Sequence, residues 1–253
     1  MNISLIGSGN VATVLGRLLK KNGHVIVEIA GRNHSHAAAL AMELCASVCD
    51  APQHINQESD MYIIAVSDDA VSAVSSALSL NEKIVVHTSG SVSADVLNHA
   101  SKNVGVLYPL QSLRKDTNYF PSIPFLIDGN NKTTLETIRD IAGTISRNVT
   151  EANDGMRLHY HLSAVAVSNF TNHLFALTKQ YAVSNNIEFN LLLPLIEEIV
   201  NRLHHYEPAA MQTGPAARGD ETTIKKHLAL LEKFPQLKHI YEAMSQSIQD
   251  FDK

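Results

Sequence analysis

Short, continuous apolar runs recur along the first 150 residues and predict β-strands that are buried on both faces. The predicted strands span residues 2–6, 24–30, 61–66, 83–88, 104–107, 124–127 and, more weakly, 148–151. Between them, apolar residues recur at helical spacing, which predicts helices over residues 11–21, 36–44, 69–78, 93–99 and 132–146. This alternation is typical of an α/β fold with a mainly parallel, Rossmann-type sheet and right-handed crossovers.

The periodicity changes after residue 152, beyond which helical spacing continues without a convincing strand. Helices are predicted over residues 154–185, 188–205, 221–233 and 237–251. Prolines and glycines between positions 208 and 219 predict a loop, and Pro235 separates the last two helices. We therefore expect a dinucleotide-binding Rossmann-type domain over residues 1–152, followed by a smaller all-α domain over residues 153–253.

The first predicted strand leads directly into a G-x-G-x-x-A motif, which is typical of dinucleotide sites. The first glycine allows a tight turn, the second lets the backbone approach a pyrophosphate, and Ala12 lets the next helix pack close to the strand. The phosphates would bind at the N-terminus of that helix. A glycine-rich turn in another kind of parallel α/β protein is the alternative. The residues expected to hold the cofactor here are Gly7, Ser8, Gly9, Asn10 and Val11.

The end of the second predicted strand favours NADP over NAD. An NAD site usually has an acidic residue there for the ribose 2′-hydroxyl, but Glu28 lies too early in the strand. Arg32 can instead pair with a 2′-phosphate through its planar fork of donors, and Asn33 could add a further donor. For Arg32, a solvated loop charge is the alternative. The later strand ends add the remaining residues expected at the cofactor: Val66, Ser67 and Thr88.

The first helix of the second predicted domain carries the best candidate for acid–base chemistry. His161 shares one helix face with Asn169, in a segment rich in alanine and valine. Polar side chains are costly to bury there unless they are partnered or used, and a histidine could protonate a carbonyl or imine that receives hydride. A core histidine satisfied by a nearby carbonyl is the alternative. The residues expected to orient the substrate are Asn169, Tyr108, Gln111, Ser89 and Arg218, although for Arg218 the sequence slightly favours a structural ion pair.

Composition and charge exclude several other classes of protein. The net charge of −5 is spread without a basic stripe, so nucleic-acid binding is not expected. No apolar run approaches the roughly 20 residues that span a bilayer, and no secretory signal pattern is present, so we expect a cytoplasmic protein. The two cysteines, Cys45 and Cys49, lie four apart on a predicted helix, which favours buried or half-buried free thiols. None of the 13 histidines has the spacing of a metal site, so we expect no metal.

Five motifs in this order resemble an uncharacterised bacterial family of NADP oxidoreductases with a C-terminal helical domain of unknown function. The motifs lie at residues 7–12, 87–90, 108–111, 161–170 and 213–220. More distantly, the chain is similar to pyrroline-5-carboxylate reductases, hydroxyisobutyrate-type 3-hydroxyacid dehydrogenases and deazaflavin-dependent NADP reductases. The resemblance implies a homodimer that pairs through the helical domain. The chain departs from these relatives because it lacks the Ser/Thr-Gly-rich signature of the first group and has no lysine near His161, where the second group uses one.

The sequence therefore predicts an NADP-dependent oxidoreductase that moves hydride between the nicotinamide and a small carbonyl, imine or hydroxy-acid substrate in the cleft between its domains. Two alternatives stay open. The chain could be a sensor or regulatory module that binds NADP without chemistry, or a structural dimer whose Rossmann domain has lost its ligand. The intact glycines and Arg32 argue against the last of these.

Overall fold

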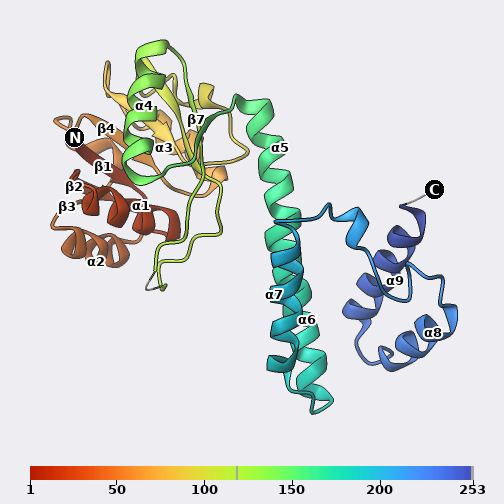
Figure 1. The fold of residues 1–253 in the computed structure, drawn as a ribbon. Coiled ribbons are helices and arrows are strands. Elements are labelled where there is room, and N and C mark those ends of the chain that lie inside the picture. The colour runs from red at the N-terminus through yellow and green to blue at the C-terminus, as the bar shows by residue number, and fades with distance from the viewer. Residues whose placement is uncertain (118, 252–253) are drawn as a thin grey trace. The chain divides into compact units, whose positions relative to one another are not determined.

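The N-terminal half of the chain folds around one eight-stranded sheet, with strand order β3-β2-β1-β4-β5-β6-β7-β8 (Figure 1). The computed structural model describes residues 1–117 and 119–251. Among these, neighbouring strands pair in parallel except β6 and β7, which are antiparallel. The predicted mainly parallel, Rossmann-type sheet is confirmed, and its order reverses between β1 and β4, where such sheets bind dinucleotides. The strands are β1 (Asn2–Ile6), β2 (Val25–Ala30), β3 (Ser47–Cys49), β4 (Met61–Ile64), β5 (Ile84–His87), β6 (Asn103–Pro109), β7 (Phe125–Gly129) and β8 (Val149–Glu151).

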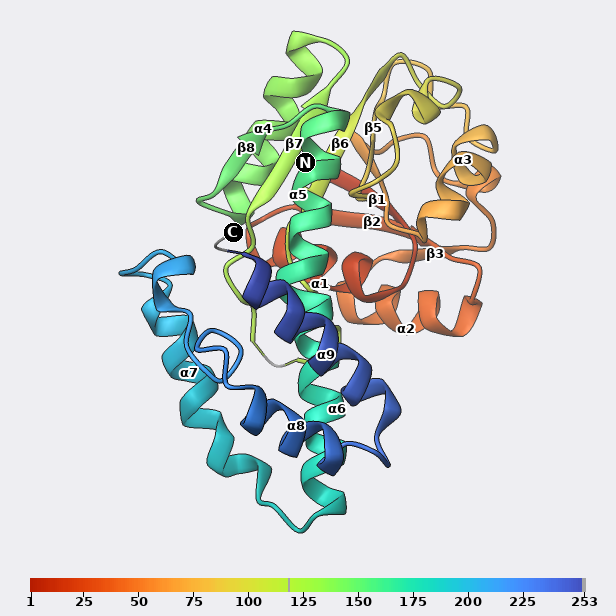
Figure 2. The same ribbon diagram turned by 90° about the vertical axis from the view of Figure 1, so that its right-hand side faces the viewer.

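Helices cover both faces of the sheet (Figure 2). On one face, α1 (Asn10–Lys21), α2 (His34–Leu44) and α4 (Lys132–Ile145) pack into one core cluster with Met61 and Ile63 of β4. On the other face, α3 (Asp68–Ser76) and the 3-10 turn η2 (Ala94–Leu97) pack with Tyr62 and Ile64. Successive strand residues point to opposite faces, so a continuous apolar strand supplies both clusters.

The segment from residue 44 to residue 99 departs from the prediction in the placement of its two cysteines, in the strand β3 and in one predicted helix. The chain leaves α2 at Cys45, which adopts a left-handed φ of 56° and ends the helix. The next residues form β3, a strand that the sequence analysis missed, so Cys45 is an exposed thiol at a helix end whereas Cys49 is a buried thiol in a strand. The helix predicted over residues 93–99 was also wrong. Ser93 Oγ accepts from Asp95 N, and this capped turn is only the four residues of η2.

Beyond β8 the regular elements of the described residues are all helices or helical turns, which confirms the predicted all-α character of this part. The helix α5 (Asp154–Ala164) leads into a π-helical segment, η3 (Val165–Phe170), and then into α6 (Thr171–Ser184). The remaining elements after β8 are the 3-10 turns η4 (Phe189–Leu192) and η5 (Ala209–Met211), and the helices α7 (Leu193–Arg202), α8 (Glu221–Leu230) and α9 (Pro235–Asp250). In the sheet unit, a 3-10 turn, η1 (Pro52–His54), precedes β4. No helix among residues 1–117 and 119–251 is both long enough and apolar enough to cross a membrane.

By its internal contacts the chain forms two units, Met1–Ala166 and Val167–Lys253. The helix α5 belongs to the first unit, with the sheet, although the sequence analysis assigned it to the helical domain from residue 153 onward. Its assignment to the sheet unit places His161 in the same unit as the predicted dinucleotide turn. The functional boundary at residues 152 and 153 stays a prediction.

Candidate active site at the carboxyl edge of the sheet

The turn after β1 requires glycine at its first position. Gly7 has a φ of 129°, and its N donates to Ala30 O at 2.7 Å. A Cβ built on Gly7 would lie 2.1 Å from Ala65 O, which follows β4. Any side chain at this position would collide with Ala65, so only glycine allows the turn after β1 to lie between Ala30 and Ala65.

The second glycine of the motif has a different environment. Gly9 is the N-cap residue of α1 with a φ of −84°, and a Cβ there would meet nothing within 4 Å. The packing of the chain therefore does not require glycine at this position. Both Gly9 and Asn10 are exposed, and the amides of the first helical turn lie at this end. Open space above a glycine at a helix N-terminus is the geometry that a pyrophosphate fits.

Arg32 follows β2 next to this turn. Its side chain is exposed and, among residues 1–117 and 119–251, has no ion-pair or hydrogen-bond partner, so it is free to pair with an anion. The neighbouring Asn33 is the N-cap residue of α2, and its Oδ1 accepts from His36 N at 3.0 Å. That oxygen already accepts one hydrogen bond, and the amide NH₂ is the donor that the Asn33 side chain could offer to a ligand. Ser8 lies close by, because a Cβ on Gly31 would be 3.1 Å from Ser8 Oγ.

The predicted residues after β4 and β5 lie at the same sheet edge. Val66 is half-buried, and the exposed Ser67 begins α3 without a side-chain cap. Thr88 is buried, and its N donates to Ile64 O at 3.1 Å. Ser89 Oγ accepts from Ser91 N at 3.2 Å and from Val92 N at 3.1 Å. The hydroxyl of Ser89 therefore shapes its own loop, a role that the sequence analysis did not assign to it.

The structure brings together two of the predicted catalytic residues, Tyr108 from β6 and His161 from α5. Tyr108 Oη and His161 Nδ1 are 3.0 Å apart, and the two rings meet edge to face at 74°. Gly90 makes this contact possible, because a Cβ there would lie 2.7 Å from His161 Nδ1 and 2.9 Å from Tyr108 Cζ. Burial, followed by the nearby carboxylate of Asp68, raises the pKa of Tyr108, so the phenol stays protonated at neutral pH.

Next to this pair is a buried polar group that the sequence analysis missed. Arg157 is 1% exposed, and its Nη2 donates to Val92 O at 2.5 Å and to Asp154 Oδ1 at 2.6 Å. His87, at the end of β5, is fully buried, and burial followed by the charge of Arg157 lowers its pKa to about 4. Within the described part of the chain, the buried side-chain nitrogens without a partner are His87 Nε2, Arg157 Nε and Arg157 Nη1. The spacing of four between Arg157 and His161 was the available sequence signal.

The remaining residues predicted to orient the substrate are Gln111, Asn169 and Arg218. Gln111 is exposed and bonds within its own loop, with Nε2 donating to Ser122 O at 3.3 Å and Oε1 accepting from Ser112 N at 2.9 Å. Asn169 and Arg218 belong to the second unit, where both are exposed. Their predicted role beside His161 stays a prediction.

Arg218 lies in a loop with a specified backbone path. Gly214 and Gly219 have φ values of 105° and 66°, and Arg218 N donates to Gly214 O at 3.3 Å. Asp220 then caps α8, as its Oδ1 accepts from Thr223 N at 3.0 Å. The Asp220 cap therefore marks where α8 begins, directly after the left-handed turn at Gly219.

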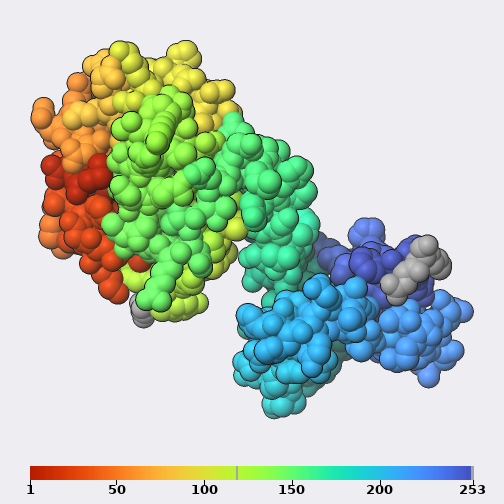
Figure 3. Space-filling model, turned by 45° about the horizontal axis from the view of Figure 1, so that its top comes forward, coloured from red at the N-terminus to blue at the C-terminus, as the bar shows by residue number. Residues whose placement is uncertain are grey.

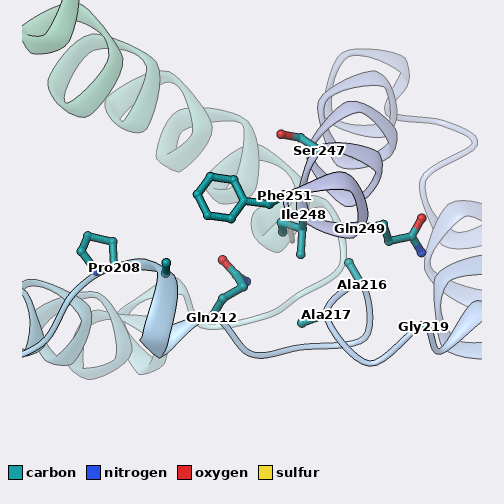
Figure 4. A pocket seen from close by; sticks show the side chains of 10 residues that line it. Pro208, Gln212, Ala216, Ala217, Gly219, Ser247, Ile248, Gln249 and Phe251 are labelled. Carbon is teal, nitrogen blue, oxygen red and sulfur yellow. The ribbon is translucent and has the colours of Figure 1, made fainter. Parts of the chain in front are cut away.

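A cavity of about 710 Å³ lies in the second unit between this loop and the end of α9 (Figure 4). The described residues that line it offer no titratable side chain, so the cavity supplies no acid or base. They are Pro208, Ala209, Gln212, Ala216, Ala217, Gly219, Ser247, Ile248, Gln249 and Phe251. The predicted acid–base residue, His161, is in the first unit.

Two family models match the chain, one in each half. Residues 2–90 match the family described as NADP oxidoreductase, coenzyme F420-dependent, and residues 123–248 match a domain of unknown function, DUF2520. No curated protein matches the sequence. These matches confirm the resemblance that the sequence motifs predicted.

Solved structures are similar over almost the whole chain. A putative NADP oxidoreductase from Bacteroides fragilis is 34% identical, with 98% of each chain covered and a TM-score of 0.93. An imine reductase from Myxococcus stipitatus, solved in complex with NADP+, is 15% identical, with 99% of this chain and 93% of that chain covered and a TM-score of 0.66. A 1-pyrroline-5-carboxylate reductase from Streptococcus pyogenes is 15% identical, with 98% of each chain covered and a TM-score of 0.65. The last two share the fold.

Proposed function

Because this chain belongs to the family of NADP oxidoreductases in which a DUF2520 domain follows the nucleotide-binding domain, we propose that it transfers hydride between NADP(H) and a small carbonyl, imine or hydroxy-acid substrate. The observation that carries the proposal is the pairing of Tyr108 with His161 at 3.0 Å, in the unit that also contains the dinucleotide turn. A proton donor and a hydride carrier at one sheet edge are what reduction of a C=O or C=N bond needs.

The chain's own residues fit the dinucleotide. The open space at Gly9 and the first-turn amides of α1 would hold the pyrophosphate, while Arg32 would pair with the 2′-phosphate. Bound NADPH would supply the hydride. Val66, Ser67 and Thr88, at the ends of β4 and β5, would border the rest of the cofactor.

His161 would supply the proton. As an imidazolium, His161 would carry a proton on each ring nitrogen, and its Nδ1–H would donate to the hydroxyl oxygen of Tyr108. The Nε2 proton would pass to the carbonyl oxygen or imine nitrogen of the substrate as its carbon accepts the hydride, which leaves His161 as a neutral imidazole. The Tyr108 hydroxyl fixes the orientation of the ring.

Turnover by the purified protein tests the proposal directly. NADPH oxidation is followed at its absorbance maximum with a panel of keto acids, cyclic imines and a deazaflavin, the last because the N-terminal family is described as coenzyme F420-dependent. We expect hydride transfer to at least one member. Tight NADPH binding without turnover would favour the sensor alternative. A ligand at about 100 times its Kd stabilises the folded protein by about 2.7 kcal/mol, so the absence of any thermal shift with NADPH at such a concentration would contradict cofactor binding.

Arg32→Ala should remove the preference for the phosphorylated cofactor. We expect the Kd for NADPH to rise by about 10- to 100-fold, because a charge-assisted hydrogen bond contributes about 1.5–3 kcal/mol, while the Kd for NADH changes little. Isothermal titration calorimetry with both cofactors measures the two constants. The matched control is Arg114→Ala, whose guanidinium pairs with Asp116 on an exposed loop. Equal losses for NADPH and NADH would show that Arg32 does not select the 2′-phosphate.

We also propose that the helical unit pairs with a second copy of the chain. Both core clusters lie in the first unit, whereas α7 buries none of its residues, and Leu195, Ile199 and the C-cap residue Leu203 are exposed on one face of it. Figure 3 shows the α7 segment at the surface of its unit. An exposed apolar stripe of this kind marks an interaction surface, and the stripe is self-complementary if two copies meet about a twofold axis.

Ile199→Glu should therefore dissociate the dimer. We expect the parent protein to sediment at twice its chain mass of 27.6 kDa and the variant at a single chain mass, because a buried carboxylate without a partner disfavours association. Asn201→Glu, at an exposed position on the same helix, adds the same charge and should leave the dimer intact. A parent protein that is monomeric at high concentration would refute the pairing.

A further inference from the structure

The buried side chain of Arg157 has no role in the proposed proton transfer, yet it lies one helical turn from the proton donor. Arg157 and His161 are four apart on α5 and therefore share one face of that helix. Of the Arg157 nitrogens, Nη2 bonds to both Val92 O and Asp154 Oδ1, while Nε and Nη1 are buried without a partner. The guanidinium thus joins the first turn of α5 to the loop after β5.

Asp154 completes this connection. Its Oδ1 also accepts from Ala94 N at 3.4 Å, so the carboxylate contacts both its own helix and the β5 loop. Burial pulls the pKa of Asp154 upward, but hydrogen bonds from Ser93 and Arg157 outweigh it and hold the pKa below its ordinary value. The carboxylate therefore stays ionised at neutral pH and keeps its bond to the guanidinium.

The same loop contacts His161 at a second point. Gly90, two residues before Val92, lies where a single added carbon would collide with His161 Nδ1 and Tyr108 Cζ. Between these points, Ser89 Oγ accepts from the amides of Ser91 and Val92 and fixes the loop's shape. One short loop is thus held by Arg157 at one end and packs against the reacting pair at the other.

The energetics argue against a purely stabilising role for the arginine. Well-packed apolar residues can often replace a buried ion pair without loss of stability, because the free energy lost when both charges leave water is about as large as the free energy gained from their attraction. Two unpartnered nitrogens on Arg157 add to that cost. What a guanidinium supplies by donating from Nη2 to two acceptors, and an apolar side chain does not, is a fixed direction and distance.

We infer that Arg157 is a positioning residue, which through Asp154 and the loop at residues 88–94 sets the Nδ1 of His161 against the hydroxyl of Tyr108. The link between this arrangement and turnover rests on the proposed function, but the arrangement itself does not. The inference can therefore be tested without substrate or cofactor.

The first test is the nitrogen NMR spectrum of the histidine rings in the full-length protein. The ring signals of His161 are assigned with His161→Ala, and Tyr108→Phe gives their position when the hydrogen bond at Nδ1 is lost. We expect Arg157→Met to move these signals toward their Tyr108→Phe position, and Arg157→Lys to move them less. Arg139→Met, which removes an exposed ion pair with Glu151 in the same unit, is the matched control and should leave them in place. Unchanged His161 signals in a folded Arg157→Met protein would overturn the inference.

The second test is a double-mutant cycle on turnover. Arg157→Met should lower kcat about 100-fold in the parent, which is the loss that a misplacement of about 1 Å can cause, but should have little further effect in a His161→Ala background. A merely structural arginine would cost the same factor in both backgrounds, and that result would refute the inference. If Arg157→Met does not fold, Arg157→Lys and Asp154→Asn carry the same cycle. Shifted His161 signals in a protein without hydride transfer would contradict the proposed function and leave the positioning role intact.

Discussion

His161→Ala is expected to lower kcat by about 10²- to 10⁴-fold, which is the usual contribution of a positioned general acid. The Kd for NADPH should stay within about twofold of the parent value, because His161 is not among the residues assigned to the cofactor and because loss of a proton donor affects the transition state rather than cofactor binding. Pre-steady-state and steady-state NADPH oxidation, together with calorimetry, separate these two quantities.

A second histidine on the same helix provides the control. His159 is exposed and lies two residues earlier on α5, where the helical repeat turns it away from Tyr108. His159→Ala should keep full turnover. The kcat of Tyr108→Phe should lie between those of His159→Ala and His161→Ala, because this variant keeps the imidazole but loses the hydroxyl that orients it. Full activity in His161→Ala would show that the proton comes from another group or from water.

Gly7→Ala should lower the stability of the fold, whereas Gly9→Ala should weaken cofactor binding, although each adds one methyl group to the same turn. At Gly7 the methyl group meets Ala65 O at 2.1 Å and the residue has a φ of 129°, so we expect a loss of about 3 kcal/mol or more in the free energy of unfolding. At Gly9 the methyl group meets nothing and the φ of −84° is open to alanine, so stability should change by less than about 0.5 kcal/mol.

Gly9→Ala should leave stability unchanged but weaken cofactor binding. The methyl group of Gly9→Ala occupies the space where the pyrophosphate would approach α1, and we expect the Kd for NADPH to rise by at least about 10-fold. Urea denaturation measures the free energy of unfolding and calorimetry measures the Kd. If Gly9→Ala binds NADPH as tightly as the parent, the phosphates do not lie above this turn, and the assignment of the cofactor site is wrong.

Local sequence pattern was sufficient for the sheet and for the dinucleotide turn because both depend on neighbours in the chain. The apolar run of β4 supplies Met61 and Ile63 to one core cluster and Tyr62 and Ile64 to the other, and only a strand covered on both faces needs that composition. The turn at Gly7 could be predicted because glycine is the residue type that readily adopts its positive φ. Where the local signal was short, the prediction was wrong, as in the three residues of β3 and the 3-10 turn η2.

By itself, then, the sequence determined the fold class, the place of the nucleotide turn and the identity of His161 as a polar residue that needed an explanation. Only the tertiary structure brought His161 to Tyr108, 53 positions away, and only it buried Arg157. A lone arginine on a helix is normally a solvated charge, since its burial depends on partners such as Val92 and Asp154 rather than on its own neighbours in sequence. Periodicity records which face of an element is buried, whereas the partners that make a buried charge tolerable come from distant segments and have no local pattern.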